Sequence, residues 1–291
     1  MQQGNSIDMS KARWAVAPLL GLLLMAVVGC GLLLRSPLPG FNPPAVTSVH
    51  LTLGNPSGAS RTPTNYLIGK PQYALSYNNQ THTPNWVSWQ LNASWLGNVP
   101  RRNDFRPDET LPSGWYRVTP SDYNGSGFDR GHMTPSADRS STVENNSATF
   151  LMTNILPQAP DNNQGPWAEL ENYCRDLVRQ GKELYLVAGG YGSKRTIALR
   201  RTDSPNDRIV APANVWKVAV VLDQPGQGLQ GIGDRTRVIA VNMPNNQGIR
   251  ETDWRTFRVS VDSIEAATGY DLLSSLPAAI QDQLERRVDQ Q

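Results

Sequence analysis

Cysteine is nearly absent from this 291-residue chain, and its scarcity excludes two classes of protein. The two cysteines, Cys30 and Cys174, are too few for a disulfide framework or for an all-cysteine zinc site. A single bridge between them is possible in principle. Cys30, however, lies in an N-terminal segment that we expect to be outside the fold, which leaves Cys174 as the expected thiol of the folded body.

A strong charge imbalance is also missing. Lysine and arginine number 27 against 25 acidic residues, so no basic tail indicates nucleic-acid binding. The 24 glycines and 22 prolines are too few and too irregular for a collagen-like or low-complexity chain. Lysine itself is scarce, with five residues against 22 arginines. Arginine grips phosphate or carboxylate through two hydrogen bonds, which lysine cannot do, but a bias in genomic composition explains the excess equally well.

Residues 1–35 have the pattern of an export signal or a membrane anchor. Lys11 and Arg13 precede an apolar run of 21 residues, 14–34, which is long enough to span a bilayer as a helix. The four residues Val-Val-Gly-Cys that end at Cys30 resemble a bacterial lipoprotein cleavage site. A lipoprotein, an uncleaved anchor and a cleaved signal peptide all stay open. All three predict an exported protein, whether periplasmic, membrane-anchored or secreted, although Arg35 weakly opposes this orientation.

The proline-rich segment 36–48 separates this N-terminus from the rest of the chain. Its prolines exclude a helix or a central strand, and we interpret it as a tether between membrane and body. Residues 49–291 contain no second shift in composition, no internal repeat and no block of charge. They are therefore predicted to form one domain.

Short apolar segments in this domain predict more strands than helices. The predicted strands lie in 67–77, 86–91, 184–188, 215–222 and 238–243. Helices are predicted at 166–180, where apolar residues recur on one face, and at 260–268 and 278–288. Because strands and helices do not alternate regularly, we expect an α+β fold with a mostly antiparallel sheet.

Histidine is rare as well, with three residues in the chain. His50 lies at the edge of the tether and His82 in a polar loop, so both are expected to be solvated. His132 differs because it directly follows Asp129–Gly131. A carboxylate, a guanidinium, a flexible glycine and an imidazole in four consecutive positions suit catalysis, although a structural salt bridge explains the same pattern.

A second polar cluster lies at the start and along one face of the first predicted helix. It consists of Asn162, Asn163, Glu171 and Arg175. An ordinary ion pair between the last two, four residues apart, behind an asparagine cap is one interpretation. Amide and carboxylate oxygens are also the ligands that Mg²⁺ prefers, in sites that keep several waters. Zinc is disfavoured, because no second histidine or cysteine stands at ligand spacing from His132.

Two stretches make the chain resemble a known family. They read FDRGHMTPSADR, residues 128–139, and NILPQAPDNNQGPWAELENYCR, residues 154–175. This combination is similar to the DNA/RNA non-specific endonucleases, the sugar-non-specific nucleases of the ββα-metal class that also includes mitochondrial endonuclease G. The resemblance extends from about residue 60 to about residue 275 and includes Arg101, in the stretch NVPRRNDFRPD. It implies a ββα-metal nuclease fold with a mostly antiparallel central sheet flanked by helices.

The resemblance also implies a role for each matching residue. His132 matches the general base that takes a proton from the attacking water, and Asn163 matches the single protein ligand of a hydrated Mg²⁺. Glu171 matches the carboxylate that orients metal-bound water, and Asp129 is expected to support the same waters. Mn²⁺ accepts the same oxygen ligands, so the choice between the two metals stays open.

Three arginines complete the implied site. Arg101 matches the residue that braces the phosphate and its developing charge, and Arg130 and Arg175 match further phosphate-side arginines. One base, one divalent ion and arginines supply what phosphodiester hydrolysis needs: an activated nucleophile, neutralised phosphate oxygens and a stabilised leaving group.

The implied substrates are DNA and RNA without sequence preference, because nothing in the chain resembles a recognition helix or an RNA-binding aromatic motif. Trp86, Trp89 and Trp95 have a strand-like spacing that favours core packing over a base-stacking platform. The membrane is a further partner if residues 1–35 stay attached or Cys30 is lipidated. Two alternatives remain: a phosphodiesterase on small substrates, and a non-catalytic nucleic-acid-binding surface protein.

Overall fold

A computed structural model describes residues 48–199 and 207–291 of the chain. The predicted signal or anchor, almost all of the tether and Cys30 lie outside these residues. Within the described part, no helix combines the length and the apolar character needed to cross a membrane.

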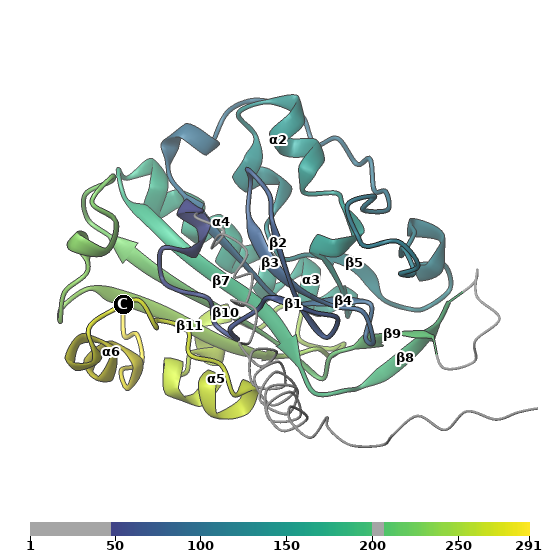
Figure 1. Cartoon of the computed structure of the whole chain (residues 1–291). Helices are drawn as coiled ribbons and strands as arrows, with labels where there is room; N and C mark the ends of the chain where they lie inside the picture. The colour runs from purple at the N-terminus through teal and green to yellow at the C-terminus, as the bar shows by residue number, and fades with distance from the viewer. Residues whose placement is uncertain (1–47, 200–206) are drawn as a thin grey trace, which may run out of the picture. The chain divides into compact units, whose positions relative to one another are not determined.

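A seven-stranded antiparallel sheet is the framework of the described residues (Figure 1). Its strands follow the spatial order β1-β2-β3-β4-β7-β10-β11. They are β1 (Arg61–Thr62), β2 (Asn65–Gly69), β3 (Ala74–Asn78), β4 (Thr83–Leu91), β7 (Glu183–Tyr191), β10 (Asn214–Leu222) and β11 (Arg237–Pro244). The three longest strands, β4, β7 and β10, lie side by side, and their mostly buried residues fit a sheet that is covered on both faces.

Each face of the sheet packs against its own helices, which lie on opposite sides in Figure 1. Trp89 and Leu186 belong to one core, together with the apolar face of α4 (Pro166–Arg179). Trp86, three residues before Trp89, and Val187, directly after Leu186, belong to the second core, which includes side chains of α5 (Val261–Thr268) and α6 (Ala278–Glu285). Successive strand residues thus face opposite layers, as the two-residue period of a strand requires.

The chain leaves the sheet after β4 and returns to it as β7, although these two strands are neighbours. We call the residues between them, 92–182, the inserted segment. It contains the antiparallel pair β5 (Asp129–His132) and β6 (Ile155–Gln158), and the helices α2 (Val143–Ala148), α3 (Pro160–Gln164) and α4. All the residues to which the sequence assigns catalytic, phosphate-binding or metal-binding roles lie in this segment.

The remaining strands, β8 (Arg195–Ala198) and β9 (Arg208–Ala211), form a separate two-stranded sheet. The described elements confirm the α+β prediction and most of the predicted strands. The predicted strand at 67–77 is instead a hairpin of β2 and β3, and the last helix ends at Glu285 rather than at residue 288.

Asn162 and Asn163 do not begin the helix at Pro166, contrary to expectation. They lie in α3, and Gly165 turns the chain from α3 into α4. A Cβ at Gly165 would lie 2.4 Å from the Arg250 carbonyl oxygen and 2.6 Å from that of Asp161, so only glycine fits this turn. The separate short helix gives Asn163 an orientation that a continuous helix would not provide.

The expectation of solvated histidines at positions 50 and 82 is wrong. His50 is buried: its Nε2 lies 2.8 Å from the carbonyl oxygen of Pro71, and its Nδ1 accepts a hydrogen bond from the Gln90 amide. Burial lowers its pKa to about 4, so the ring is neutral. His82 is also buried, and its ring meets the edge of Tyr116. The residues next to these two histidines in the sequence do not indicate that both rings pack inside the fold.

The tryptophan prediction is confirmed. Trp86 and Trp89 are fully buried, one in each core, and Trp95 packs against the core of α4. The guanidinium of Arg139 lies 4.1 Å from the Trp95 ring centroid.

Candidate active site

The pair of strands β5 and β6 places His132 at the centre of the candidate site. Its imidazole is 8% exposed and lies between two phenylalanine rings, with centroids 5.3 Å from Phe105 and 4.9 Å from Phe150. Burial and the nearby Arg101 and Arg130 lower the pKa of His132 to about 3. The ring is therefore neutral at physiological pH, the form in which an imidazole accepts a proton.

The Nε2 atom of His132 is buried and has no hydrogen-bond partner. Buried polar atoms without a partner are rare in folded proteins, because each one loses its hydrogen bonds with water. The Nδ1 atom of His82 is unpaired as well, but the charges near that ring are those of carboxylates, whereas two guanidinium groups lie near His132. The unpaired nitrogen together with the two arginines therefore makes His132 the candidate functional histidine.

Glycine is required beside this histidine for a steric reason. A Cβ on Gly131 would lie 1.8 Å from the side-chain oxygen of Gln158 on β6. Gln158 is fully buried and donates to Asn162 of α3, so it has little room to move. Gly131 thus allows β5, β6 and α3 to pack closely.

Asp129 lies at the other end of β5 and holds the amide of Asn163. One of its carboxylate oxygens, Oδ2, accepts a hydrogen bond from Asn163 Nδ2 at 2.9 Å and another from Gln164 Nε2 at 2.7 Å. A carboxylate can only accept here, so this contact fixes which end of the Asn163 amide is nitrogen. The Asn163 oxygen then points away from Asp129, and no hydrogen bond within the described residues occupies it.

This arrangement fits a divalent metal ion. Asn163 is only half-buried, its amide oxygen accepts no hydrogen bond from the described residues, and the carboxyl group of Asp129 lies beside it. One amide oxygen with a neighbouring carboxylate is the type of ligand set that hard, hydrated cations such as Mg²⁺ accept. No second histidine or cysteine belongs to this donor set, so zinc has no support here.

Glu171 lies on α4 and faces a buried lysine of the sheet. Lys217 of β10 is 1% exposed, and its Nζ lies 3.5 Å from Glu171 Oε1 and 4.0 Å from the centroid of the Trp167 ring. Burial raises the pKa of Glu171, and the charges of Lys217 and Arg175 oppose that rise. Lys217 thus helps to keep this carboxylate ionised.

The arginines have different partners. Arg101 donates to Ser136 Oγ at 2.8 Å and lies over the Phe150 ring, whereas the exposed Arg130 lies over Phe105. Arg101 also interacts electrostatically with Glu171 and with Arg130. The structure therefore brings His132, Arg101, Arg130 and Glu171 into one electrostatic neighbourhood.

Arg175 does not have the hydrogen-bond partner that its spacing from Glu171 along the helix predicts. Its guanidinium donates to Asp138 at 2.7 Å and to Asn172 at 2.5 Å, and both members of the Asp138 pair are buried. It does not form a direct ion pair with Glu171. Any contact of Arg175 with phosphate would therefore be made in addition to its buried ion pair with Asp138.

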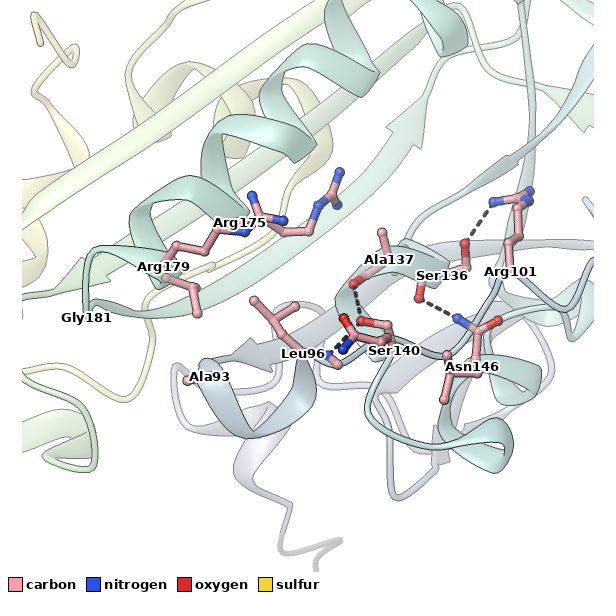
Figure 2. A pocket seen from close by; sticks show the side chains of 14 residues that line it. Ala93, Leu96, Arg101, Ser136, Ala137, Ser140, Asn146, Arg175, Arg179 and Gly181 are labelled. Carbon is pink, nitrogen blue, oxygen red and sulfur yellow. Dashed lines mark hydrogen bonds between the residues drawn. The ribbon is translucent and has the colours of Figure 1, made fainter.

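An open groove of about 800 Å³ lies beside these residues (Figure 2). Arg175 and Arg179 of α4 are on one side of it and Arg101 is on the other. No acidic residue is among the described side chains that line it, although Arg179 pairs with Asp176 at the surface. His132 and Asn163 are not part of its lining, but Arg101 lines the groove and also lies near His132.

Comparison with known proteins decides the family. The sequence profile described as DNA/RNA non-specific endonuclease matches residues 54–279. The chain belongs to the DNA/RNA non-specific endonuclease family. It is 55% identical over 276 residues to a nuclease of Nostoc sp., covering 92% of this chain and 96% of that protein. It is 31% identical over 210 residues to human mitochondrial endonuclease G, covering 70% of this chain and 68% of that protein.

The fold comparison agrees. The crystal structure of the EndoG/EndoGI complex, described as showing the mechanism of EndoG inhibition, contains a chain that matches 82% of this nuclease with a TM-score of 0.65. The match covers 96% of that chain, at 25% sequence identity. The nuclease therefore has the α+β fold of the ββα-metal class, and it is a metal-dependent hydrolase of nucleic acids.

Sequence reasoning missed several residues that shape the site of this nuclease. Asp138 holds Arg175, Gln164 shares Asp129 with Asn163, and Lys217 supports Glu171. Asp138 is six residues beyond His132, inside the same stretch FDRGHMTPSADR, but its partner lies on a helix 37 residues away. Lys217 lies within the buried strand β10. A single lysine in an otherwise apolar strand indicates a buried charge that needs a partner, and this was the signal available in the sequence.

The contact between Lys217 and Glu171 generates a prediction about pH. Replacing Lys217 by Met removes a positive charge that lowers the pKa of Glu171, so that pKa will rise further. Because the carboxylate must be ionised to act, activity will be lost at a higher pH than in the wild type as the pH falls. The acidic limb of the kcat/KM profile, measured by plasmid digestion, is expected to shift upward by about one pH unit. Lys182→Met, at a half-buried lysine that pairs with Asp223 rather than with Glu171, is the control, and an unchanged acidic limb in Lys217→Met contradicts the assignment.

Proposed function

We propose that this nuclease is Mg²⁺-dependent, cuts DNA and RNA without sequence preference and uses His132 as its general base. The observation that carries the proposal is the unpaired Nε2 atom of a neutral, buried imidazole beside Arg101 and Arg130. A neutral imidazole accepts a proton from water, and two guanidinium groups next to it attract the phosphate on which that water acts.

The remaining residues have complementary tasks. Asn163 holds the metal through its amide oxygen, and Asp129 keeps that amide in orientation through its 2.9 Å hydrogen bond. The bound Mg²⁺ supplies positive charge to the phosphate and the leaving oxygen. Glu171, ionised beside Lys217, orients water near the site. Arg101 and Arg130 brace the phosphate, and Arg175 contributes from the groove.

Contacts limited to phosphate explain why base identity does not matter. The three groove arginines can bind any nucleic-acid backbone, and activity should therefore fall steeply with salt. Mn²⁺ accepts the same oxygen ligands, so activity measured in a titration with each of the two ions distinguishes them.

We also propose that the protein is exported. The basic flank and apolar run of residues 1–35 support this, as does the lipoprotein-like sequence at Cys30. Digestion of DNA and RNA in gels loaded with fractionated cells, with and without chelator, tests substrate, metal need and compartment together. Activity confined to the cytoplasmic fraction overturns export, and activity that survives chelation overturns the metal requirement.

The first variant tests the base. His132→Ala is expected to lower kcat on plasmid DNA at least 100-fold while KM stays nearly unchanged, because the lost proton transfer acts on turnover rather than on phosphate binding. His82→Ala is the matched histidine control, since that ring lies outside the site. Both variants are compared at equal folded fraction, measured by thermal unfolding. Retention of most of the turnover in His132→Ala removes this residue from the role.

The second variant tests the metal ligand. In Asn163→Ala the amide oxygen is lost, and the Mg²⁺ concentration that gives half-maximal activity should rise at least tenfold. Asn246→Ala, at an exposed asparagine away from Asp129, should leave that concentration unchanged. A metal titration curve of Asn163→Ala that superimposes on the wild type rules out this ligand.

The third variant tests the groove and the polymeric substrate. Arg179→Ala removes one phosphate contact, so KM for plasmid DNA should rise several-fold, and the slope of log KM against log salt should fall by about one. Hydrolysis of a small chromogenic diester, which is too short to reach the groove, should not change. Arg61→Ala, at an exposed arginine of β1, is the control. Equal losses on both substrates favour the alternative of a small-substrate phosphodiesterase.

A further inference from the structure

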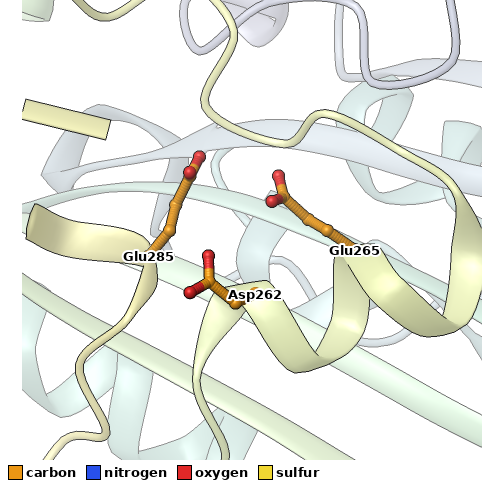
Figure 3. Close-up of side chains that lie close together, drawn as sticks. All are labelled: Asp262, Glu265 and Glu285. Atoms are coloured by element: carbon orange, nitrogen blue, oxygen red, sulfur yellow. The ribbon is translucent and has the colours of Figure 1, made fainter. Parts of the chain in front are cut away.

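Three carboxylates converge between α5 and α6, on the sheet face opposite α4 (Figure 3). They belong to Asp262 and Glu265 of α5 and to Glu285 at the end of α6. One oxygen from each lies within 4.8 Å of the others. In Figure 3 the three side chains point toward one another across the gap between the helices. We call these three residues the α5–α6 carboxylate cluster.

Glu285 is the member that most needs a partner. Glu285 is only 8% exposed, and its Oε1 atom is buried and accepts no hydrogen bond. A buried carboxylate without a donor loses its hydration and gains nothing in return. This unsatisfied oxygen belongs to the carboxylate that Figure 3 shows directed at Asp262 and Glu265.

Nearby charges increase the need for a cation. None of the three carboxylates forms an ion pair with a lysine, arginine or histidine in the part of the chain that the structure describes. Burial raises the pKa of Glu285 to about 7, and the negative charges of Glu265, Asp271, Asp262 and Asp282 add to the rise.

The number of carboxylates in the cluster favours Ca²⁺ over Mg²⁺. Ca²⁺ accepts six to eight oxygen ligands in flexible geometry, whereas Mg²⁺ is usually bound through one or two carboxylates. Glu265 is already oriented, because its Oε1 accepts a hydrogen bond from the Leu272 amide at 2.7 Å. Asp262 is exposed, which leaves room for waters to complete the six to eight ligands of calcium.

We propose that Asp262, Glu265 and Glu285 form a Ca²⁺-binding site that joins α5 to α6 and is distinct from the catalytic metal site. The ion neutralises the three carboxylates and supplies the partner that Glu285 Oε1 lacks. With three carboxylates and several waters, the expected Kd is about 10⁻⁴–10⁻³ M. Because the unfolded chain does not bring residues 262 and 285 together, binding stabilises the folded protein and holds α6 in place.

The test uses the full chain, stripped of metal with chelator, in the Asn163→Ala background so that the proposed catalytic ligand is absent. Titration calorimetry with CaCl₂ should give one site per chain. The midpoint of thermal unfolding should rise by about 5–10 °C when Ca²⁺ reaches about 100 times Kd. Mg²⁺ should bind at least tenfold more weakly.

Two added substitutions locate the site. Glu285→Gln and Asp262→Asn should each abolish the heat of Ca²⁺ binding and the rise in Tm, and Asp262 is exposed, so its replacement leaves the core intact. Glu144→Gln, at an exposed glutamate of α2, should keep both. A calcium response that survives both substitutions, or that is absent in Asn163→Ala, overturns the proposal. The proposal also fails if calcium does not raise the Tm of the parent chain while Glu285→Gln raises that Tm without calcium, because protonation alone then satisfies the cluster.

Discussion

Two adjacent buried charges of opposite sign, Asp138 and Arg139, attach the inserted segment to the sheet. Asp138 accepts hydrogen bonds from Trp89 of β4 at 3.0 Å and from Arg175 of α4 at 2.7 Å. Arg139 donates to the carbonyl oxygens of Gln72 and Gln90. Neither residue is more than 1% exposed, and removing a partner would leave an uncompensated buried charge. The placement of α4 against the sheet therefore depends on these contacts.

Glu171, one of the candidate site residues, takes its position from that attachment. Glu171 lies one turn before Arg175 on α4, so the ion pair that fixes Arg175 also fixes the carboxylate opposite Lys217. His132 is set by a different support, the pairing of β5 with β6 and the two phenylalanine rings. The site thus combines a dry environment, which keeps the imidazole neutral, with a wetter one around Asp129 and Asn163, which suits a hydrated ion.

The parts of the molecule that were predictable are those with local signals. The long buried strands and the α4 helix have unbroken apolar or periodic patterns, and the motif around His132 is contiguous. The break between α3 and α4 was missed, since Gly165 is required by a distant carbonyl, that of Arg250. The burial of His50 was missed for the same reason, because its partners are on other strands and turns. Pairs such as Arg175 with Asp138 depend on packing that spacing along one helix does not reveal.

The position of β7 between β4 and β10 has a consequence for how the chain is made. Leu91 and its partner Leu184 are neighbours in the sheet, yet the ribosome releases the second only after the whole inserted segment has emerged. Closing so long a loop is entropically costly, and sheets of this kind form late and slowly. A nascent chain that ends before β7 lacks the strand that lies between β4 and β10. The central sheet, and with it the support of the inserted segment, is therefore incomplete until at least residue 191 has been synthesised.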